Sequence, residues 1–240
     1  MRLGFAAIAA LAGSAAAHMA LTYPCPRYSP HCATKPRLPA GVADYDYSLK
    51  TPLSSSNGGS KPLCKYTKAW PQPVASWTAG QSVTVTFQKD GAGHGGGHCQ
   101  FSMSYDGGKT FVVIHEELEH CFFNGPSTSN QPQVFQYTFN LPQALPASNS
   151  AIFSWSWVNA MGNREFYMNC ADVTISGTSK SFTGKKMTIL NFPGYPALPE
   201  FGGNYKTGLQ YYTNQPSITV TGNGGSAPAP NSDYIMITPS

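Results

Sequence analysis

Apolar and polar residues alternate along much of the chain after residue 80, and this two-residue period is typical of half-buried β-strands. The runs at 99–105 and 110–115 flank the turn Asp106-Gly107-Gly108-Lys109, so we expect them to form a hairpin. The runs expected as strands are 82–87, 99–105, 110–115, 134–139, 152–158, 170–175, 186–190 and 217–220. No helical period competes with them, although 116–121 allows one short helical turn. Strands at this spacing predict an all-β fold, an immunoglobulin-like or fibronectin III-like β-sandwich with long loops.

Three segments depart from this pattern. Residues 1–17 combine the cation Arg2, an apolar run and three alanines, which are the features of a secretory signal peptide cleaved after Ala17. Residues 21–61 are rich in proline, tyrosine and serine, and they predict a long loop. The tail 223–240 is rich in glycine, proline and serine and is expected to be disordered. One domain, 18–222, remains, and we expect it to be secreted, extracellular and monomeric.

Composition narrows the partners of this domain. Charged residues make up 11 % of the chain, well below the usual quarter or so, and the 15 basic residues are scattered rather than clustered. This pattern argues against binding to nucleic acid or to a membrane surface. No apolar run after the signal is long enough to span a bilayer. Six cysteines in a secreted chain predict three disulfides, and a zinc site is disfavoured because no C-x2-C pair occurs.

Candidate chemistry begins at His18, because cleavage after Ala17 would make it the N-terminal residue. A free α-amine and an imidazole on one residue can chelate one metal ion, although cleavage could also expose a histidine by chance. A second candidate is the glycine-rich loop 91–100, which contains His94 and His98. Glycine lets a backbone approach a ligand closely, so this loop suits a metal site, but it also suits a simple flexible connection.

The third candidate is the segment 163–170, NREFYMNC, which follows the tryptophan-containing run. If it is extended, Glu165, Tyr167 and Asn169 share one face of the strand, while the other face is apolar and ends at a cysteine. A carboxylate and a phenol are costly to bury without a purpose. The alternative is that Tyr167 is an ordinary core tyrosine.

These segments together resemble the fungal lytic polysaccharide monooxygenases of auxiliary activity family eleven, which act on chitin. The matching motifs are His18-Met19, His94-Gly95-Gly96-Gly97 with Cys99-Gln100, Val113-Ile114-His115 leading to Cys121, Trp155-Ser156-Trp157-Val158-Asn159, and Gly162-Asn163-Arg164-Glu165-Phe166-Tyr167-Met168-Asn169-Cys170-Ala171. The resemblance covers roughly residues 60–176 well and the rest loosely. Several motifs in the same order make it more specific than any one of them.

The resemblance implies that one copper ion is held by a histidine brace. His18 would supply its α-amine and one ring nitrogen, and His94 would supply a third nitrogen, a donor set that suits divalent copper. Tyr167 would lie at the axial position, with Glu165 next to it. The family pattern places the ligand before the three glycines, so it favours His94 over His98, which would lie behind the site or at the surface. The remaining histidines are expected to be structural or exposed: His31, His115 and His120.

The resemblance also implies disulfides between Cys64 and Cys170 and between Cys99 and Cys121, which leaves Cys25 to pair with Cys32. It departs from this chain between His18 and Cys64, where the chain is longer than usual. Because this insertion could reach the face that meets the polysaccharide, it leaves the substrate open.

The activity that the resemblance implies is oxidative cleavage of an insoluble β-1,4-linked polysaccharide, most readily chitin, with O2 or H2O2 and an external electron donor. A hydrolase is disfavoured, because the acidic residues offer no obvious pair of carboxylates. Two alternatives stay open: a secreted copper-binding protein with a histidine brace but no oxidative activity, and a non-catalytic chitin-binding module.

Overall fold

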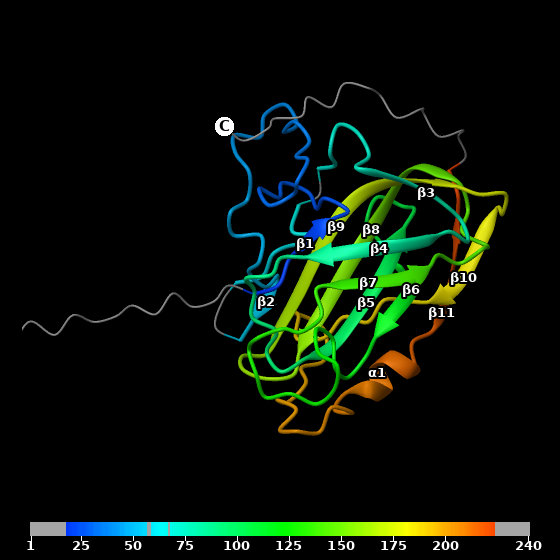
Figure 1. Ribbon diagram of the computed structural model, residues 1–240. Helices are drawn as coiled ribbons and strands as arrows, with labels where there is room; N and C mark the ends of the chain where they lie inside the picture. Colours follow the sequence, from blue (N-terminus) through cyan, green and yellow to red (C-terminus); the bar gives the residue numbers. More distant parts are fainter. Residues whose placement is uncertain (1–17, 57–58, 67, 224–240) are drawn as a thin grey trace, which may run out of the picture.

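The computed structural model of the protein describes residues 18–56, 59–66 and 68–223 (Figure 1). Within them lie eleven strands and one short helix. The elements are β1 (Leu21–Tyr23), β2 (Ser54–Ser55), β3 (Ala75–Thr78), β4 (Ser82–Phe87), β5 (Gly97–Ser104), β6 (Val112–Glu117), β7 (Gln136–Asn140), β8 (Ser148–Asn159), β9 (Glu165–Ser176), β10 (Ser181–Lys185), α1 (Leu209–Thr213) and β11 (Ser217–Thr221). The predicted signal 1–17 and the predicted tail beyond residue 223 lie outside the described residues.

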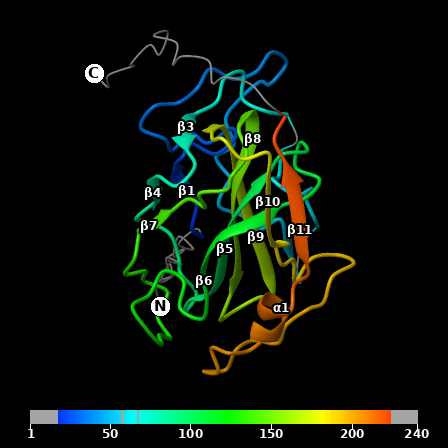
Figure 2. The ribbon, with the colours of Figure 1, turned by 90° about the vertical axis from the view of Figure 1, so that its right-hand side faces the viewer.

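Two sheets face each other, so the predicted β-sandwich is confirmed (Figure 2). One sheet has the order β1-β4-β7, and the other has the order β2-β9-β8-β5-β6 with β3 also paired to β9. Strand β4 shows how the sequence encodes this, since its apolar residues Val83, Val85 and Phe87 are buried while the residues between them are half-buried or exposed. The main core, which includes Phe101, Trp155 and many other apolar side chains, fills the space between the sheets.

A further layer covers the outer face of the larger sheet. Strand β9 is buried on both faces over nearly its whole length, and its Phe166, Met168 and Cys170 pack into a second core. The chain between residues 186 and 213 supplies much of that core, including Met187, Phe201 and α1 residue Tyr212. Figure 2 shows this segment, with α1, on the side of the large sheet away from β1, β4 and β7. The long β9 is therefore an interior strand, which explains its near-continuous run of buried residues.

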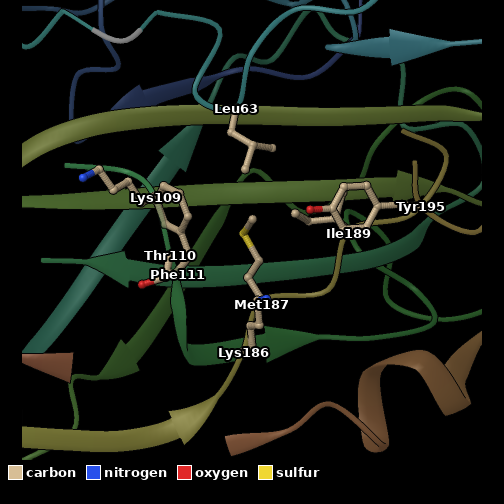
Figure 3. A pocket seen from close by; sticks show the side chains of 8 residues that line it. All are labelled: Leu63, Lys109, Thr110, Phe111, Lys186, Met187, Ile189 and Tyr195. Carbon is tan, nitrogen blue, oxygen red and sulfur yellow. The ribbon is translucent and has the colours of Figure 1, made fainter. Parts of the chain in front are cut away.

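The outer layer contains a small open pocket between its covering segment and the 109–111 turn (Figure 3). Its lining residues are Leu63, Lys109, Thr110, Phe111, Lys186, Met187, Ile189 and Tyr195. None of the residues singled out as candidate chemistry lines it.

Two expectations about secondary structure are wrong. Residues 186–190 are not a strand, because their apolar side chains cover the second core from an irregular segment, and only Lys186 forms a single bridge, with Val112. Residues 116–121 form no helical turn, since Glu116 and Glu117 complete β6 and a turn follows. The strand beside β11 is instead β10, which pairs with it antiparallel over its full length.

The insertion before Cys64 is mostly irregular, as expected, but it is firmly attached to the domain. A third apolar cluster of the domain contains Tyr28 of the insertion, Trp70 and the Cys25–Cys32 disulfide. Arg27 forms a buried ion pair with Asp172 of β9, with Nη2 2.5 Å from Oδ1. The structure contains the two disulfides that the resemblance implies, Cys64–Cys170 and Cys99–Cys121, and the pair that they leave, Cys25–Cys32.

Candidate metal centre

Side chains from three separate segments meet at one end of the sandwich. Nitrogen atoms of His18 and His94 and a carboxylate oxygen of Glu165 all lie within 4.8 Å of one another. The centroid of the His18 ring lies 4.9 Å from that of His94 and 5.0 Å from that of Tyr167. The structure therefore brings together the four residues that the sequence selected, although they are up to 149 positions apart (167 minus 18).

His18 is placed by the start of β1 and by the loop before His94. It forms an isolated parallel bridge with Ala92, and a side chain at Gly91 would come within 3.0 Å of the His18 carbonyl oxygen. Glycine at 91 therefore suits the close approach of the two backbones, since a larger residue would displace the Met19 side chain or the His18 backbone. The next residue, Met19, is fully buried and fixes the chain, whereas the His18 side chain is 25 % exposed. Its ring thus faces the site from a firmly packed backbone.

His94 owes its position to an unusual backbone. It has a φ of 43°, and the three glycines that follow are also in the positive-φ region. A side chain at Gly95 would lie 2.7 Å from the Ser127 carbonyl oxygen, and one at Gly97 would lie 2.1 Å from that of Val158. The glycine run therefore lets the loop pack tightly against β8 while the His94 ring stacks on Trp157, with centroids 5.9 Å apart.

Both imidazoles are held in the neutral form that a metal ligand requires. Burial lowers the pKa of His94 to about 4, and the neighbouring charges of His18 and Arg164 act in the same direction. Burial also lowers the pKa of His18, although the negative charge of Glu165 opposes this. His94 Nε2 is buried and has no hydrogen-bond partner within the part of the chain that the structure describes. An orphaned ring nitrogen of this kind is costly unless a further group binds it.

Glu165 and Tyr167 form a pair on one face of β9, as their spacing predicted. The Tyr167 hydroxyl donates a short hydrogen bond to Glu165 Oε2, and the same oxygen lies 3.7 Å from His18 Nε2. Burial raises the pKa of Tyr167 well above its usual value, and the charge of Glu165 and the hydrogen bond to it add to this effect. Tyr167 is therefore a neutral phenol whose proton is directed at Glu165, and its ring packs against Trp157 at 4.7 Å.

The donor atoms fit a metal ion that prefers nitrogen. Two neutral imidazoles suit copper, zinc, nickel or iron, and a nearby carboxylate alone does not choose among them. If processing freed the His18 amine, a third nitrogen would join the set and favour divalent copper over the others. The orphaned His94 Nε2 is the observation that makes an absent ligand, rather than an internal hydrogen bond, the natural partner of this site.

His98, the second histidine of the loop, belongs to the framework instead. It is 1 % exposed, its Nδ1 accepts a hydrogen bond from the Glu119 N–H, and its Nε2 lies 2.9 Å from the Thr207 carbonyl oxygen. Both ring nitrogens are thus occupied by backbone groups, and of the two positions expected for His98, behind the site or at the surface, the surface position is wrong. These two bonds leave no ring nitrogen of His98 open to a further ligand.

The remaining histidines also lie outside the metal centre. His115 stacks on Phe139 with centroids 4.4 Å apart and hydrogen-bonds Glu117. His120 packs edge-on against Tyr205. Half-buried His31 belongs to the insertion.

Sequence reasoning missed the turn that stands beside His94. The Met161 N–H donates to the His94 carbonyl oxygen at 3.1 Å, and the side chains of Arg164 and Glu200 bond the backbone of the same turn. Arg164 appeared in the sequence only as one letter of a motif. Glu200 carried no signal, because it follows the turn by nearly forty residues and lies in an irregular segment.

Comparison with known proteins gives consistent matches. A family model described as "Lytic polysaccharide mono-oxygenase, cellulose-degrading" matches residues 41–173. The chain is 42 % identical over 167 residues to AA11 family lytic polysaccharide monooxygenase A of Aspergillus fumigatus, covering 69 % of this chain and 68 % of that protein. It is 26 % identical to monooxygenase B of Aspergillus fumigatus, covering 95 % of this chain and 60 % of that protein.

An AA11 enzyme of Aspergillus oryzae is 34 % identical to this chain over 161 residues, covering 60 % of this chain but 37 % of that protein. The chain therefore spans between about a third and two thirds of the length of these relatives. The part matched by the family model, residues 41–173, contains His94, Glu165 and Tyr167.

Proposed function

This chain belongs to the lytic polysaccharide monooxygenases, within the AA11 group, and on that premise we propose that it is a secreted copper enzyme that cleaves chitin oxidatively. The observation that carries the proposal is that His18 and His94 lie together beside Glu165 and Tyr167, and that Nε2 of His94 is buried without a hydrogen-bond partner. The other histidine of the loop, His98, has both ring nitrogens bonded to backbone groups.

In the proposal, the amine and ring of His18 and Nε2 of His94 would hold the copper ion. Bound copper would supply one-electron redox chemistry with an oxygen co-substrate, and an external donor would supply the electrons. The protein provides geometry and access to the substrate, as is usual where a cofactor carries the difficult chemistry. The solvent-facing edge of His18, which is 25 % exposed, leaves a route for a large insoluble substrate.

Besides the metal ligands, the proposal gives roles in the reaction to Tyr167 and Glu165. Glu165 orients the Tyr167 hydroxyl by accepting its proton in a hydrogen bond, and its other neighbour is the His18 ring at 3.7 Å. A buried carboxylate at this distance can position and polarise a small polar co-substrate and can hold a proton during turnover. Trp157 packs against both His94 and Tyr167 and excludes water from behind them.

Cellulose is the second candidate substrate, because the description of the matching family model names cellulose degradation. The names of the AA11 relatives specify no glycan. Mass spectrometry of products released from chitin and from cellulose, with and without reductant, separates the two. Release of oxidised oligosaccharides from neither substrate, by copper-loaded protein with reductant, would contradict the proposal and favour a copper-binding protein or a chitin-binding module.

The requirement for a free amine gives the sharpest test. Protein that begins at His18 is compared with protein that carries one extra alanine before His18, at matched copper loading. We expect the extended form to bind copper much more weakly and to release almost no oxidised sugar, because an amide nitrogen is a poor neutral ligand. The circular dichroism of the two forms should agree. Equal activity of both forms would show that the N-terminal histidine is incidental.

A further inference from the structure

In the turn between β8 and β9, two side chains of opposite charge, Glu200 and Arg164, hydrogen-bond the backbone of the central residue, Gly162. The N–H of Gly162 donates to Glu200 Oε1 at 2.9 Å. The carbonyl oxygen of Gly162 accepts a hydrogen bond from Nη2 of Arg164 at 2.8 Å. Both peptide groups of this exposed glycine are thus fixed, one by a carboxylate and the other by a guanidinium. Charge-assisted hydrogen bonds are shorter and stronger than neutral ones, so this grip is unusually firm for a surface turn.

The same guanidinium ties the turn to two further segments. Arg164 Nη1 donates to the carbonyl oxygens of Asn159, at the end of β8, and of Pro199, in the outer layer. The Asn159 side chain in turn donates to the carbonyl oxygens of Met161 and Asn163. Three consecutive carbonyl groups, at positions 161 to 163, therefore accept hydrogen bonds from side chains, and the loop has little freedom to move.

This turn lies directly against His94. The Met161 N–H bonds the His94 carbonyl oxygen, and a Cβ built on Gly162 would lie 3.7 Å from His94 Nδ1. Gly162 has a φ of 89°, a conformation that other residues adopt only with strain. The turn thus bonds the His94 backbone and lies on the Nδ1 side of its ring, while the other ring nitrogen, Nε2, is the orphaned atom. A shift of the turn would move the ring and reorient Nε2.

We propose, building on the copper function above, that Arg164 and Glu200 are positioning residues that form a clasp. The clasp holds Gly162 against the His94 imidazole and sets the direction in which Nε2 meets the metal. Lysine cannot replace Arg164 in this role, because it lacks the planar fork that bonds several carbonyl groups at once. Groups that orient a metal ligand in this way typically change metal affinity about 10- to 100-fold when they are removed.

Glu200 lies outside residues 41–173, the part matched by the family model. The outer layer around it contacts the site region again where the Phe201 N–H donates to the Ala160 carbonyl oxygen at 3.0 Å. Tyr205 reaches the loop on the other side of the glycine run, and its hydroxyl accepts a hydrogen bond from the Ser127 N–H. The irregular segment after β10 thus acts on the metal centre, in addition to covering the second core.

The test compares four proteins that begin at His18: the wild type, Glu200→Ala, Glu200→Gln and Arg164→Lys. Copper affinity is measured by calorimetry, and the geometry of the site is measured by the electron paramagnetic resonance spectrum of the Cu(II) form. We expect Glu200→Ala and Arg164→Lys to weaken copper binding about tenfold and to change the copper hyperfine splitting. Glu200→Gln keeps an oxygen acceptor for the Gly162 N–H, so it should restore most of the wild-type spectrum.

Asp44→Ala serves as the matched control, because Asp44 is an exposed carboxylate in the insertion and its recorded hydrogen bond is to the adjacent Tyr45 N–H. It should leave both measurements unchanged. Wild-type spectra and affinities for both Glu200→Ala and Arg164→Lys would overturn the clasp. If Glu200→Ala fails to fold, the comparison of Arg164→Lys with Glu200→Gln and the wild type tests the clasp in its place. Tight copper binding by the His94→Ala variant would instead contradict the proposed function. The failure of the clasp and the failure of the proposed function are therefore distinguishable.

Discussion

Strand β9 carries a buried carboxylate near each end, and the surrounding protein neutralises the two in different ways. Asp172 receives two hydrogen bonds from the Arg27 guanidinium and a third from the Trp70 N–H. Glu165, which is equally buried, receives its hydrogen bond from the neutral Tyr167 hydroxyl and faces a histidine at 3.7 Å. Both carboxylates lie on one strand, and both are less than a tenth exposed.

The difference shows how a structural charge can be told from a functional one. At Asp172 a permanent cation from the insertion balances the carboxylate, so nothing further is needed and the pair fastens the insertion to the sheet. At Glu165 the basic partner within 4 Å is an imidazole, the pKa of which burial lowers, and the adjacent His94 has an unpartnered nitrogen, while the nearby Arg164 guanidinium bonds backbone carbonyl groups. Perturbed titratable groups with incomplete pairing are typical of functional sites.

The largest expected effect is on metal binding, and it distinguishes the two histidines of the glycine-rich loop. His94→Ala should abolish tight copper binding, because it removes the orphaned nitrogen, while its unfolding free energy should change little. His98→Ala should keep copper affinity but destabilise the fold by about 1–3 kcal/mol, because the buried Glu119 N–H and Thr207 carbonyl lose their partner. Calorimetry and urea unfolding on both variants measure this. Loss of copper binding in the His98 variant alone would reverse the ligand assignment.

The next effect concerns stability at the other end of β9. Asp172→Ala leaves the Arg27 guanidinium buried without its carboxylate, so we expect the free energy of unfolding to fall by about 3–5 kcal/mol. Copper affinity should stay within about twofold of the wild type, because the change is remote from His94. Replacing both partners, with Arg27→Met and Asp172→Leu, should recover much of the loss. A marked fall in copper affinity of the folded Asp172 variant would show that the two ends are not independent.

A smaller change, at Glu165, should affect the rate of the reaction and leave stability unchanged, which is the reverse of the result expected at Asp172. Glu165→Gln keeps the shape of the side chain but removes its charge, and we expect the rate of oxidised product release to fall about tenfold, or about 1.4 kcal/mol in activation free energy. Copper affinity and the free energy of unfolding should be nearly unchanged. Product release is followed by mass spectrometry at saturating reductant. An unchanged rate would remove Glu165 from the mechanism and make it a structural carboxylate like Asp172.

The smallest effect is a dependence of stability on pH. Burial lowers the pKa of His98 below its usual value of 6.5, although the Thr207 carbonyl and nearby glutamates oppose this. As the pH falls below 6.5, the unfolded chain therefore takes up a proton that folded His98 resists, and stability falls. Urea unfolding of metal-free protein between pH 7 and pH 5 should show this slope, and His98→Gln should reduce it. An identical slope in both proteins would show that His98 titrates normally.

The alternation of residues was enough to locate most of the sandwich. It placed 82–87 within its true limits, as strand β4, and it placed the cores of β5, β8 and β11. It failed at 186–190, because the apolar side chains there cover a second core from an irregular segment whose backbone is bonded by scattered partners. It also missed β1, β2 and β3, which span two to four residues and are too short to show a period.

The candidate site could be predicted to a similar extent and for related reasons. Cleavage singled out His18, the glycine-rich loop offered His94 and His98 together, and alternation placed Glu165 and Tyr167 on one face, while the family resemblance selected His94 and gave the other two their roles. The clasp could not be predicted, since it depends on Glu200, whose only connection to the site is a contact between distant segments. The identity of such a contact is decided by how the outer layer packs, and no local pattern records that.

The burial of β9 on both faces has a consequence for how this scaffold can diversify. Alternate side chains of the strand pack into different cores, so a substitution at nearly any of its positions disturbs one core or the other, and new specificities cannot readily arise there. The solvent-exposed connections near the metal centre, around residues 124–131 and 202–206, carry no such double constraint. Libraries that aim to redirect the enzyme toward other glycans should therefore randomise those connections and leave the strand, together with Arg164 and Glu200, untouched.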